Sequence, residues 1–155
     1  MRTGIGFDIH KLEPKRKLIL AGVEIPYQFG LKGHSDGDVI LHAISDAIAG
    51  ALSEDDIGTV FPDTDRSIQG IKSEEILKHY YNLLAAREAK IVNIDIVILA
   101  ERPMLKTWYG QMKKNIATIL NIEISRIGIK AKTMEGIGEI GKGQAIACLA
   151  SILIE

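Results

Sequence analysis

Residues 35–52 have the sequence SDGDVILHAISDAIAGAL, and this stretch decides the fold that we expect. Ser35 suits the start of a helix. Asp38, His42 and Asp46 follow at intervals of four residues, so they form one polar stripe along that helix. The apolar residues of the opposite face are Val39, Ile40, Ile44, Ala47 and Ala51. The spacing predicts an amphipathic helix that buries one face against a sheet.

Further helices and several strands are expected around this stretch. Helices are expected at 73–89 and 103–120, which begin with a serine and a proline. Strand-length runs of Ile, Val and Leu occupy 3–10, 17–25 (with a break at Ala21 and Gly22), 91–100, 126–133 and 145–154. The order predicts an α+β fold, a two-layer sandwich in which one mixed β-sheet carries its helices mainly on one face. Functional sites are expected in the loops at 28–34, 53–72 and 134–144.

Length and charge limit the class of protein. A chain of 155 residues has the usual size of one domain, so we expect a single domain over residues 1–155. The 19 Lys and Arg residues and 20 Asp and Glu residues leave a formal net charge of −1. This balance argues against nucleic acid as a partner, because non-specific binding to phosphates needs a wide basic surface.

Three further features concern location and redox chemistry. The longest nearly apolar run, residues 145–154, is much shorter than the roughly 20 residues of a membrane-spanning helix, so no membrane partner is expected. The N-terminus has no apolar signal segment, which favours the cytoplasm. Cys148 is the only cysteine, and its apolar neighbours predict a small core side chain without redox chemistry.

Three residues from two of these elements form a candidate metal site. Asp8 and His10 are two residues apart on an expected strand, so their side chains project from the same face. His42 lies on the expected helix, where the flanking carboxylates of Asp38 and Asp46 would orient its ring. One carboxylate and two imidazoles leave a tetrahedral zinc ion with one open position. The alternative is that the strand pair and the helix stripe are both solvated polar surface.

His34 and Ser35 precede the same helix and form a candidate anion site. The backbone N–H groups of the first turn, the Ser35 hydroxyl and the His34 ring would converge on an anion. The alternative is an N-cap serine beside a loop histidine. Lys130, Lys132, Thr133 and Lys142 are further candidates for phosphate groups, or else solvated surface residues.

Residues 136–141 match the dinucleotide-binding pattern G-x-G-x-x-G. We reject that interpretation, because a strand and not a helix is expected after them, and we expect a flexible turn between two strands. The sequence contains no convincing Ser/His/Asp or Cys/His set, and His79 is expected at the surface of a charged helix. A metal combined with anion donors points to phosphoryl chemistry.

Four motifs carry a resemblance to a known family. The sequence contains, in this order, GFDIH at 6–10, GHSDGDVILHA at 33–43, DIG at 56–58 and FPDTD at 61–65. Together they closely resemble the 2-C-methyl-D-erythritol 2,4-cyclodiphosphate synthase family of the non-mevalonate isoprenoid pathway. The resemblance implies a phosphorus-oxygen lyase that converts 4-diphosphocytidyl-2-C-methyl-D-erythritol 2-phosphate to the cyclic diphosphate and CMP. It also implies a homotrimer with active sites between neighbouring subunits.

The resemblance also implies roles for individual residues. Zinc would be bound by Asp8, His10 and His42, Mg²⁺ or Mn²⁺ would accompany the substrate diphosphate, and His34 and Thr133 would be the catalytic residues. Contacts to substrate are implied for Asp8, His10, His34, Ser35, Asp56, Ile57, Gly58, Phe61, Pro62, Asp63, Thr64 and Asp65. The cytidine pocket of the adjacent subunit would contain Ala100, Pro103, Met104, Leu105 and Lys106. The diphosphate would be contacted by Thr133 through its hydroxyl and by Glu135 through the second metal. Lys132 and Lys142 are further candidates for contacts to substrate, from their charge and not from the resemblance.

Some positions depart from the family's usual pattern. Met104 stands where a lysine commonly follows the proline, and Lys132 stands where the family usually has a threonine. Lys142 and Leu149 stand where members often have an arginine and an acidic residue at the central cavity of the trimer, so binding of an isoprenoid diphosphate there is not implied. Two other functions stay open: a non-enzymatic nucleotide-binding trimer, and a metal-dependent phosphohydrolase that uses zinc-bound water.

Overall fold

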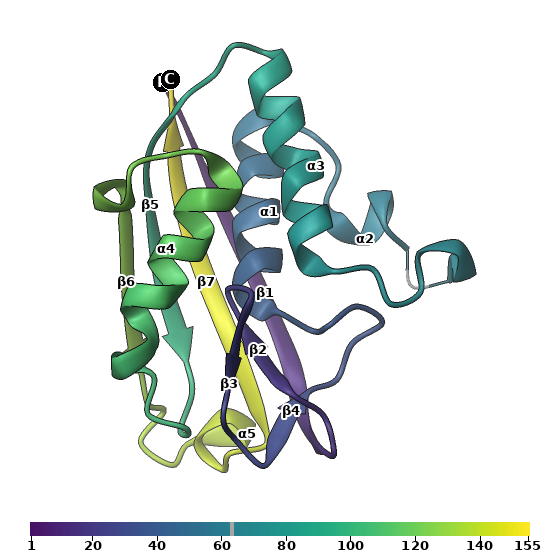
Figure 1. The fold of residues 1–155 in the computed structure, drawn as a ribbon, viewed down its shortest axis with the longest axis vertical. Helices are drawn as coiled ribbons and strands as arrows, with labels where there is room; N and C mark the ends of the chain where they lie inside the picture. Colours follow the sequence, from purple (N-terminus) through teal and green to yellow (C-terminus); the bar gives the residue numbers. More distant parts are fainter. Residues whose placement is uncertain (63) are drawn as a thin grey trace.

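A computed structural model describes residues 1–62 and 64–155 of the chain. Five strands form one mixed sheet in the order β4-β1-β7-β5-β6 (Figure 1). Strands β5 and β6 are parallel, and the other neighbouring pairs are antiparallel. The bounds of the strands are β1 (Arg2–Pro14), β4 (Phe29–Leu31), β5 (Ile91–Leu99), β6 (Ile127–Lys132) and β7 (Ala145–Ile154).

Three helices lie on one side of this sheet, namely α1 (Val39–Leu52), α3 (Ser73–Ala86) and α4 (Tyr109–Leu120) (Figure 1). Helix α1 packs on β1 and β7, α3 packs on α1, and α4 packs on β6. The shorter elements are α2 (Ile57–Val60), α5 (Gly138–Gly141) and the 3₁₀ turns η1 (Arg66–Ile68), η2 (Lys106–Trp108) and η3 (Ile124–Arg126). The expected two-layer α+β fold is confirmed. Among the described residues, none of the helices has the length and apolar character to cross a membrane.

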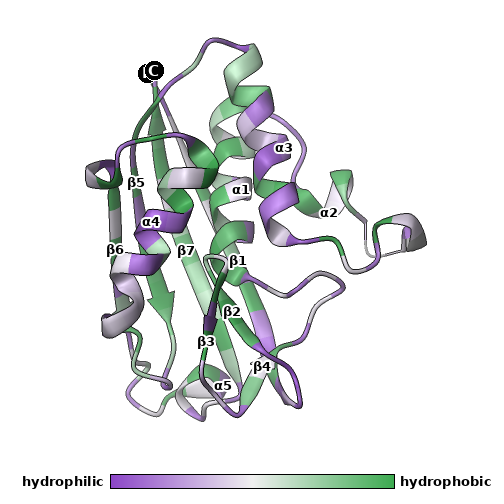
Figure 2. Ribbon diagram, in the orientation of Figure 1, coloured by the Kyte–Doolittle hydropathy of each residue, from purple (hydrophilic) through white to green (hydrophobic). Residues whose placement is uncertain are grey.

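Helix α1 is enclosed between the sheet and α3. All of its residues are buried except Asp46 and Gly50. In Figure 2, α1 is mostly green, whereas α3 and α4 alternate between hydrophilic and hydrophobic residues. The polar stripe of α1 is therefore not a solvated surface, since Asp38 is 0% and His42 8% exposed.

Helix α1 begins at Val39 because Asp38, and not the expected Ser35, is its N-cap. The Asp38 carboxylate accepts hydrogen bonds from two N–H groups of the first turn and from two in the turn between β2 (Leu18–Leu20) and β3 (Val23–Ile25). The four donors are Ile40 (3.1 Å), Leu41 (3.2 Å), Ala21 (2.9 Å) and Gly22 (2.6 Å). Burial raises the pKa of Asp38 to about 6, although the backbone donors lower it. The carboxylate ties the start of α1 to the hairpin.

Three other expected elements differ from those observed. The segment at 17–25 does form strands, but β2 and β3 pair only with each other, because Ala21 and Gly22 have φ angles of 52° and 72° that turn the chain back. Strand β4 lies in an expected loop, since three residues give no periodic signal. Helix α4 starts only at Tyr109, after η2, so residues 103–105 are not helical.

Two glycines of β1 allow this strand to lie directly against α1. A Cβ atom on Gly6 would lie 1.9 Å from the backbone oxygen of Ala43, and a Cβ atom on Gly4 would lie 1.9 Å from that of Ala47. Side chains alternate along a strand, so Asp8 and His10 project from the same face as these glycines. The packing of glycine against the α1 backbone therefore sets the distance between Asp8, His10 and the helix.

The first prediction concerns this contact. Gly6→Ala should lower the free energy of unfolding by about 1–3 kcal/mol, because backbone atoms must move apart to admit the methyl group. Gly50→Ala is the matched control on α1, since its Cβ would lie 3.8 Å from the nearest atom. It should be neutral or stabilise by up to about 1 kcal/mol. Urea unfolding measures both, and a Gly6→Ala protein as stable as the wild type would contradict the proposed close packing.

Candidate functional site

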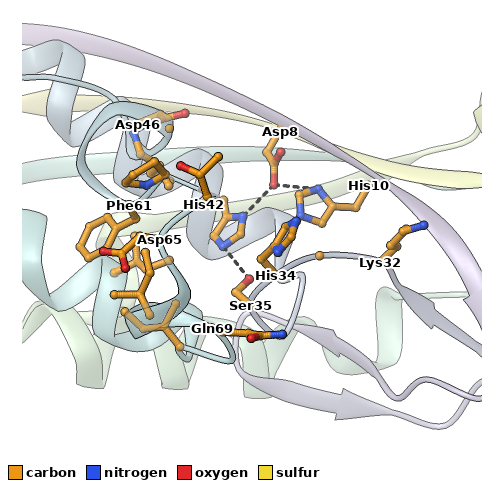
Figure 3. A pocket seen from close by; sticks show the side chains of 18 of the residues that line it. Asp8, His10, Lys32, His34, Ser35, His42, Asp46, Phe61, Asp65 and Gln69 are labelled. Carbon is orange, nitrogen blue, oxygen red and sulfur yellow. Dashed lines mark hydrogen bonds and ion pairs between the residues drawn. The ribbon is translucent and has the colours of Figure 1, made fainter.

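Asp8 and His10 from β1 meet His42 from α1 at one point (Figure 3). One Asp8 carboxylate oxygen, Oδ2, lies 3.0 Å from His42 Nδ1 and 3.3 Å from His10 Nδ1. The two rings make an edge contact with centroids 5.5 Å apart. All three candidate ligand atoms lie within 4.8 Å of one another. The convergence predicted from the sequence is confirmed.

This donor set fits a tetrahedral divalent metal. With metal–ligand distances of about 2.0–2.1 Å, neighbouring ligand atoms are about 3.3 Å apart, close to the distances observed. Burial raises the pKa of Asp8, but hydrogen bonds and charge attraction from His10 and His42 outweigh it and hold the pKa well below its usual range. The carboxylate is therefore ionised and ready to coordinate a cation, with three ligands supplied by two rigid elements.

The other nitrogen of His42 faces two serine hydroxyls. Nε2 lies 2.9 Å from Ser73 Oγ, at the start of α3, and 3.2 Å from Ser35 Oγ. The buried Ser73 hydroxyl donates in turn to the Asp36 carboxylate. Asp36 and Ser73 were not expected from the sequence, because no local pattern links Ser73 to a histidine 31 residues earlier in the chain.

The carboxylates that were expected to orient His42 have other partners. Asp38 caps α1, and Asp46 accepts a hydrogen bond of 3.0 Å from the N–H of Ile57 at the start of α2. The backbone part of the expected anion site is also wrong, because the first-turn N–H groups of Ile40 and Leu41 already donate to Asp38. His34 and Ser35 still line the cavity described below. The expected role of the two carboxylates fails because both accept hydrogen bonds from backbone N–H groups.

The metal triad opens into a cavity of about 940 Å³ (Figure 3). Most of the residues before position 66 for which the resemblance implies contact with zinc or substrate line this cavity. They are Asp8, His10, His34, Ser35, His42, Ile57, Gly58, Phe61, Pro62, Thr64 and Asp65. Asp56 instead caps α2 through the N–H of Thr59, and Asp63 lies outside the described residues. Two cations not anticipated from the sequence, Arg16 and Lys32, also line the cavity. The Arg16 guanidinium donates to the backbone oxygens of Gly33 and Ser35, both at 3.4 Å.

A second cluster lies at the carboxyl ends of the parallel strands β5 and β6. The Ala100 N–H donates to the Lys132 oxygen at 3.0 Å, and Thr133 Oγ1 donates to Glu135 at 3.0 Å. The residues observed to line the 940 Å³ cavity do not include Ala100, Pro103, Met104, Leu105, Lys106, Lys132, Thr133, Glu135 or Lys142. Within one chain, the two predicted halves of the site are therefore separate.

Three other sequence predictions have mixed outcomes. Strand β7 follows residues 136–141, as expected from the rejection of a dinucleotide site, although these residues include the short helix α5 and are not only a turn. His79 is half-buried, with ring contacts to Phe61 at 5.3 Å and Tyr80 at 5.2 Å, so its purely surface role is wrong. Cys148 is buried in the core as expected, and burial raises the pKa of its thiol.

Comparison with known proteins is decisive for the family. The YgbB family model matches residues 1–155. The chain belongs to the YgbB family. A curated relative, 2-C-methyl-D-erythritol 2,4-cyclodiphosphate synthase of Alkaliphilus oremlandii, is 49% identical over 155 residues, which cover 99% of both chains.

Solved structures similar to this YgbB family chain agree on the fold. The bifunctional IspDF of Campylobacter jejuni is 42% identical, with a TM-score of 0.94 over 99% of this chain and 42% of that one. The Plasmodium falciparum IspF CDP complex is 40% identical, with a TM-score of 0.88 over 99% of this chain and 94% of that one. The likeness thus extends over the whole sheet and its helices.

The second prediction tests the metal site. His42→Ala should weaken zinc binding by more than about 100-fold, because a three-ligand site loses one ligand. His79→Ala is the matched control, since it removes a half-buried histidine outside the triad. Competition with a chromogenic chelator measures both affinities. Equal zinc binding by His42→Ala and the wild type would exclude His42 as a ligand.

Proposed function

We propose that this chain converts 4-diphosphocytidyl-2-C-methyl-D-erythritol 2-phosphate to 2-C-methyl-D-erythritol 2,4-cyclodiphosphate and CMP. The observation that carries the proposal is the Asp8, His10 and His42 triad opening into a cavity that also contains His34 and two cations. The printed name of the 49% identical relative supports the same reaction. The lyase class, the ions and the role of each residue are part of the proposal.

The reaction needs position and charge neutralisation more than a reactive side chain. An oxygen of the 2-phosphate attacks the β-phosphorus of the same molecule, and a new P–O bond closes the ring. The bond from that phosphorus to the bridging oxygen breaks, and CMP leaves with the electron pair. The nucleophile is already anionic, so no strong general base is required, and holding both groups in one cavity supplies the effective concentration.

The cavity residues have complementary roles in this proposal. Asp8, His10 and His42 would hold zinc, which when bound neutralises charge on the phosphoryl oxygens as a Lewis acid. Arg16 provides a positive charge for phosphate oxygens, and Lys32, which pairs with Glu13 at 3.1 Å, would provide a second one by leaving that partner. Arg16 also holds the loop that carries His34, through its contacts with the backbone oxygens on either side of that residue. His34 would donate to a phosphoryl oxygen as charge develops there.

The two separate clusters support a site completed by a neighbouring subunit. Residues 100–106 and 132–135 would supply the cytidine and diphosphate contacts, with Thr133 as a catalytic donor and Glu135 holding Mg²⁺ or Mn²⁺. These residues are held together by hydrogen bonds, including one of 3.2 Å from the Met134 N–H to the Glu101 carboxylate. The IspF CDP complex among the solved relatives supports a cytidine diphosphate as the ligand.

The sheet face opposite the helices supports assembly of three chains. It exposes a row of large apolar side chains on β1 and β7, namely Ile5 (69% exposed), Phe7 (52%), Ile9 (47%) and Leu149 (41%). Phe7 and Leu149 are directly opposite each other in the β1–β7 register. A contiguous apolar patch of this kind is typical of a protein interface. We propose that it forms the contact between subunits of a homotrimer.

The third prediction is the product assay. Purified protein with the cytidyl diphosphate substrate and Mg²⁺ should form CMP and the cyclic diphosphate in equal amounts, followed by phosphorus NMR. Prior treatment with a strong zinc chelator should stop both products, and added zinc should restore them. Inorganic phosphate or hydrolysed fragments without a ring would favour the phosphohydrolase. Tight nucleotide binding without any product would favour the binding trimer.

The fourth prediction tests the assembly. Phe7→Glu should convert the trimer to monomers, because a carboxylate at the centre of the apolar row would have to be buried without a partner. Ile124→Glu is the matched control, since Ile124 is 46% exposed on η3, away from this row. Light scattering after size exclusion should give three times the 17.0 kDa chain mass for the wild type and the control. A trimeric Phe7→Glu protein would rule out this face.

A further inference from the structure

The environment of His42 Nε2 restricts where the protons of this buried network lie. Asp36 Oδ1 accepts the Ser73 hydroxyl, and Asp36 Oδ2 accepts the Ser73 backbone N–H at 3.3 Å. A hydroxyl has one hydrogen to donate, and an ionised carboxylate only accepts. Ser73 Oγ therefore acts as an acceptor toward His42 Nε2, which lies 2.9 Å away. His42 must carry its proton on Nε2.

This tautomer determines what the opposite nitrogen presents. A neutral imidazole with a proton on Nε2 has a lone pair on Nδ1. Nδ1 lies 3.0 Å from the carboxylate oxygen of Asp8. Without a metal, a proton on Nδ1 joins these two atoms by a hydrogen bond, and a bound metal ion would take the place of that proton. The same pair of atoms is part of the candidate metal set. The hydroxyl on one side of the ring thus prepares the other side to coordinate a metal.

We propose that Ser73 and Asp36 are positioning residues that hold His42 with Nε2 protonated and Nδ1 directed at the metal. The proposal rests on the metal site of the proposed function. Imidazole ligands of metals usually donate their second N–H to a carboxylate or another acceptor, which fixes the ring and raises its basicity. Here a serine hydroxyl connects the ring to the carboxylate.

The fold explains why Ser73 is suited to this role. It is fully buried at the first position of α3, and α3 packs along α1, so its hydroxyl is fixed between the two helices. Ser35 is a weaker candidate, because it lies 3.2 Å from Nε2 and its oxygen already accepts the Gly37 N–H at 3.0 Å. Ser35 is also expected to contact substrate, whereas Ser73 is absent from the cavity lining.

The fifth prediction compares two buried serines. Ser73→Ala should weaken zinc binding by about 10–100-fold, since outer residues that orient a ligand contribute this much to affinity. Ser45→Ala is the matched control: Ser45 is also fully buried, lies on α1 three residues after His42, and donates to the Leu41 oxygen at 2.8 Å. It should keep the zinc affinity of the wild type. Asp36→Asn, which keeps an acceptor oxygen but removes the charge, should shift the affinity in the same direction as Ser73→Ala, by a smaller factor.

Imidazole ¹⁵N NMR provides a readout that a merely structural role would not change. In the zinc-loaded wild type, the ¹⁵N signals of His42 should show Nδ1 bound to metal and a protonated Nε2. In Ser73→Ala these two signals should weaken or broaden, while urea unfolding shows that the variant is still folded. Wild-type zinc affinity in Ser73→Ala, or coordination through Nε2, would overturn the proposal. An unchanged zinc affinity in His42→Ala would overturn the metal site and the positioning role together. If Ser73→Ala weakens zinc binding but the wild type forms no cyclic product, the positioning role is supported and only the proposed reaction fails.

Discussion

The structure depends on the close approach of β1 to α1. Two residues along a strand advance by about 6.6 Å, and four residues along a helix by about 6.0 Å, so the two repeats nearly match. Gly4 lies against Ala47, and Gly6 lies against Ala43. One more strand step leads to Asp8, whose side chain reaches His42, the residue just before Ala43 on the helix. The contact of the two glycines with α1 therefore also sets the distance between the candidate metal ligands, and a side chain at either glycine would disturb both.

The polar side chains at the start of α1 and along it have hydrogen-bond partners, although the helix is enclosed. Asp38 accepts four backbone N–H groups, Ser45 donates to a carbonyl, and His42 contacts Asp8 on one side and hydroxyls on the other. Among the described residues, no buried side-chain nitrogen or oxygen lacks a hydrogen-bond partner. A buried polar group without a partner costs about 1–3 kcal/mol, so these partners fix one arrangement of the helix against the sheet and α3.

The sequence was most informative where one element carries the whole pattern. Strand β7 has its predicted bounds, and the i, i+2 spacing correctly placed Asp8 and His10 on one face. The start of α1 was missed because Ser35 and Asp38 both suit an N-cap, and only the position of the hairpin decides for Asp38. Ser73 was missed because tertiary packing alone brings it to His42. Whether the polar stripe of α1 is solvated was ambiguous, because periodicity does not reveal that α3 packs over this helix.

Two departures from the family's usual pattern, Met104 and Lys132, lie away from this rigid centre. Met104 is 80% exposed and Lys132 is also exposed, both in the cluster at the ends of β5 and β6. Neither lines the cavity of the metal triad. Exposed positions in loops and at strand ends tolerate substitution because few buried contacts depend on them, whereas β1 and α1 are held by backbone packing. If this cluster holds the cytidine nucleotide as proposed, changes at Met104 and Lys132 would alter that contact without moving Asp8, His10 or His42. The packing of β1 on α1, and not these exposed positions, sets the geometry of the candidate metal site.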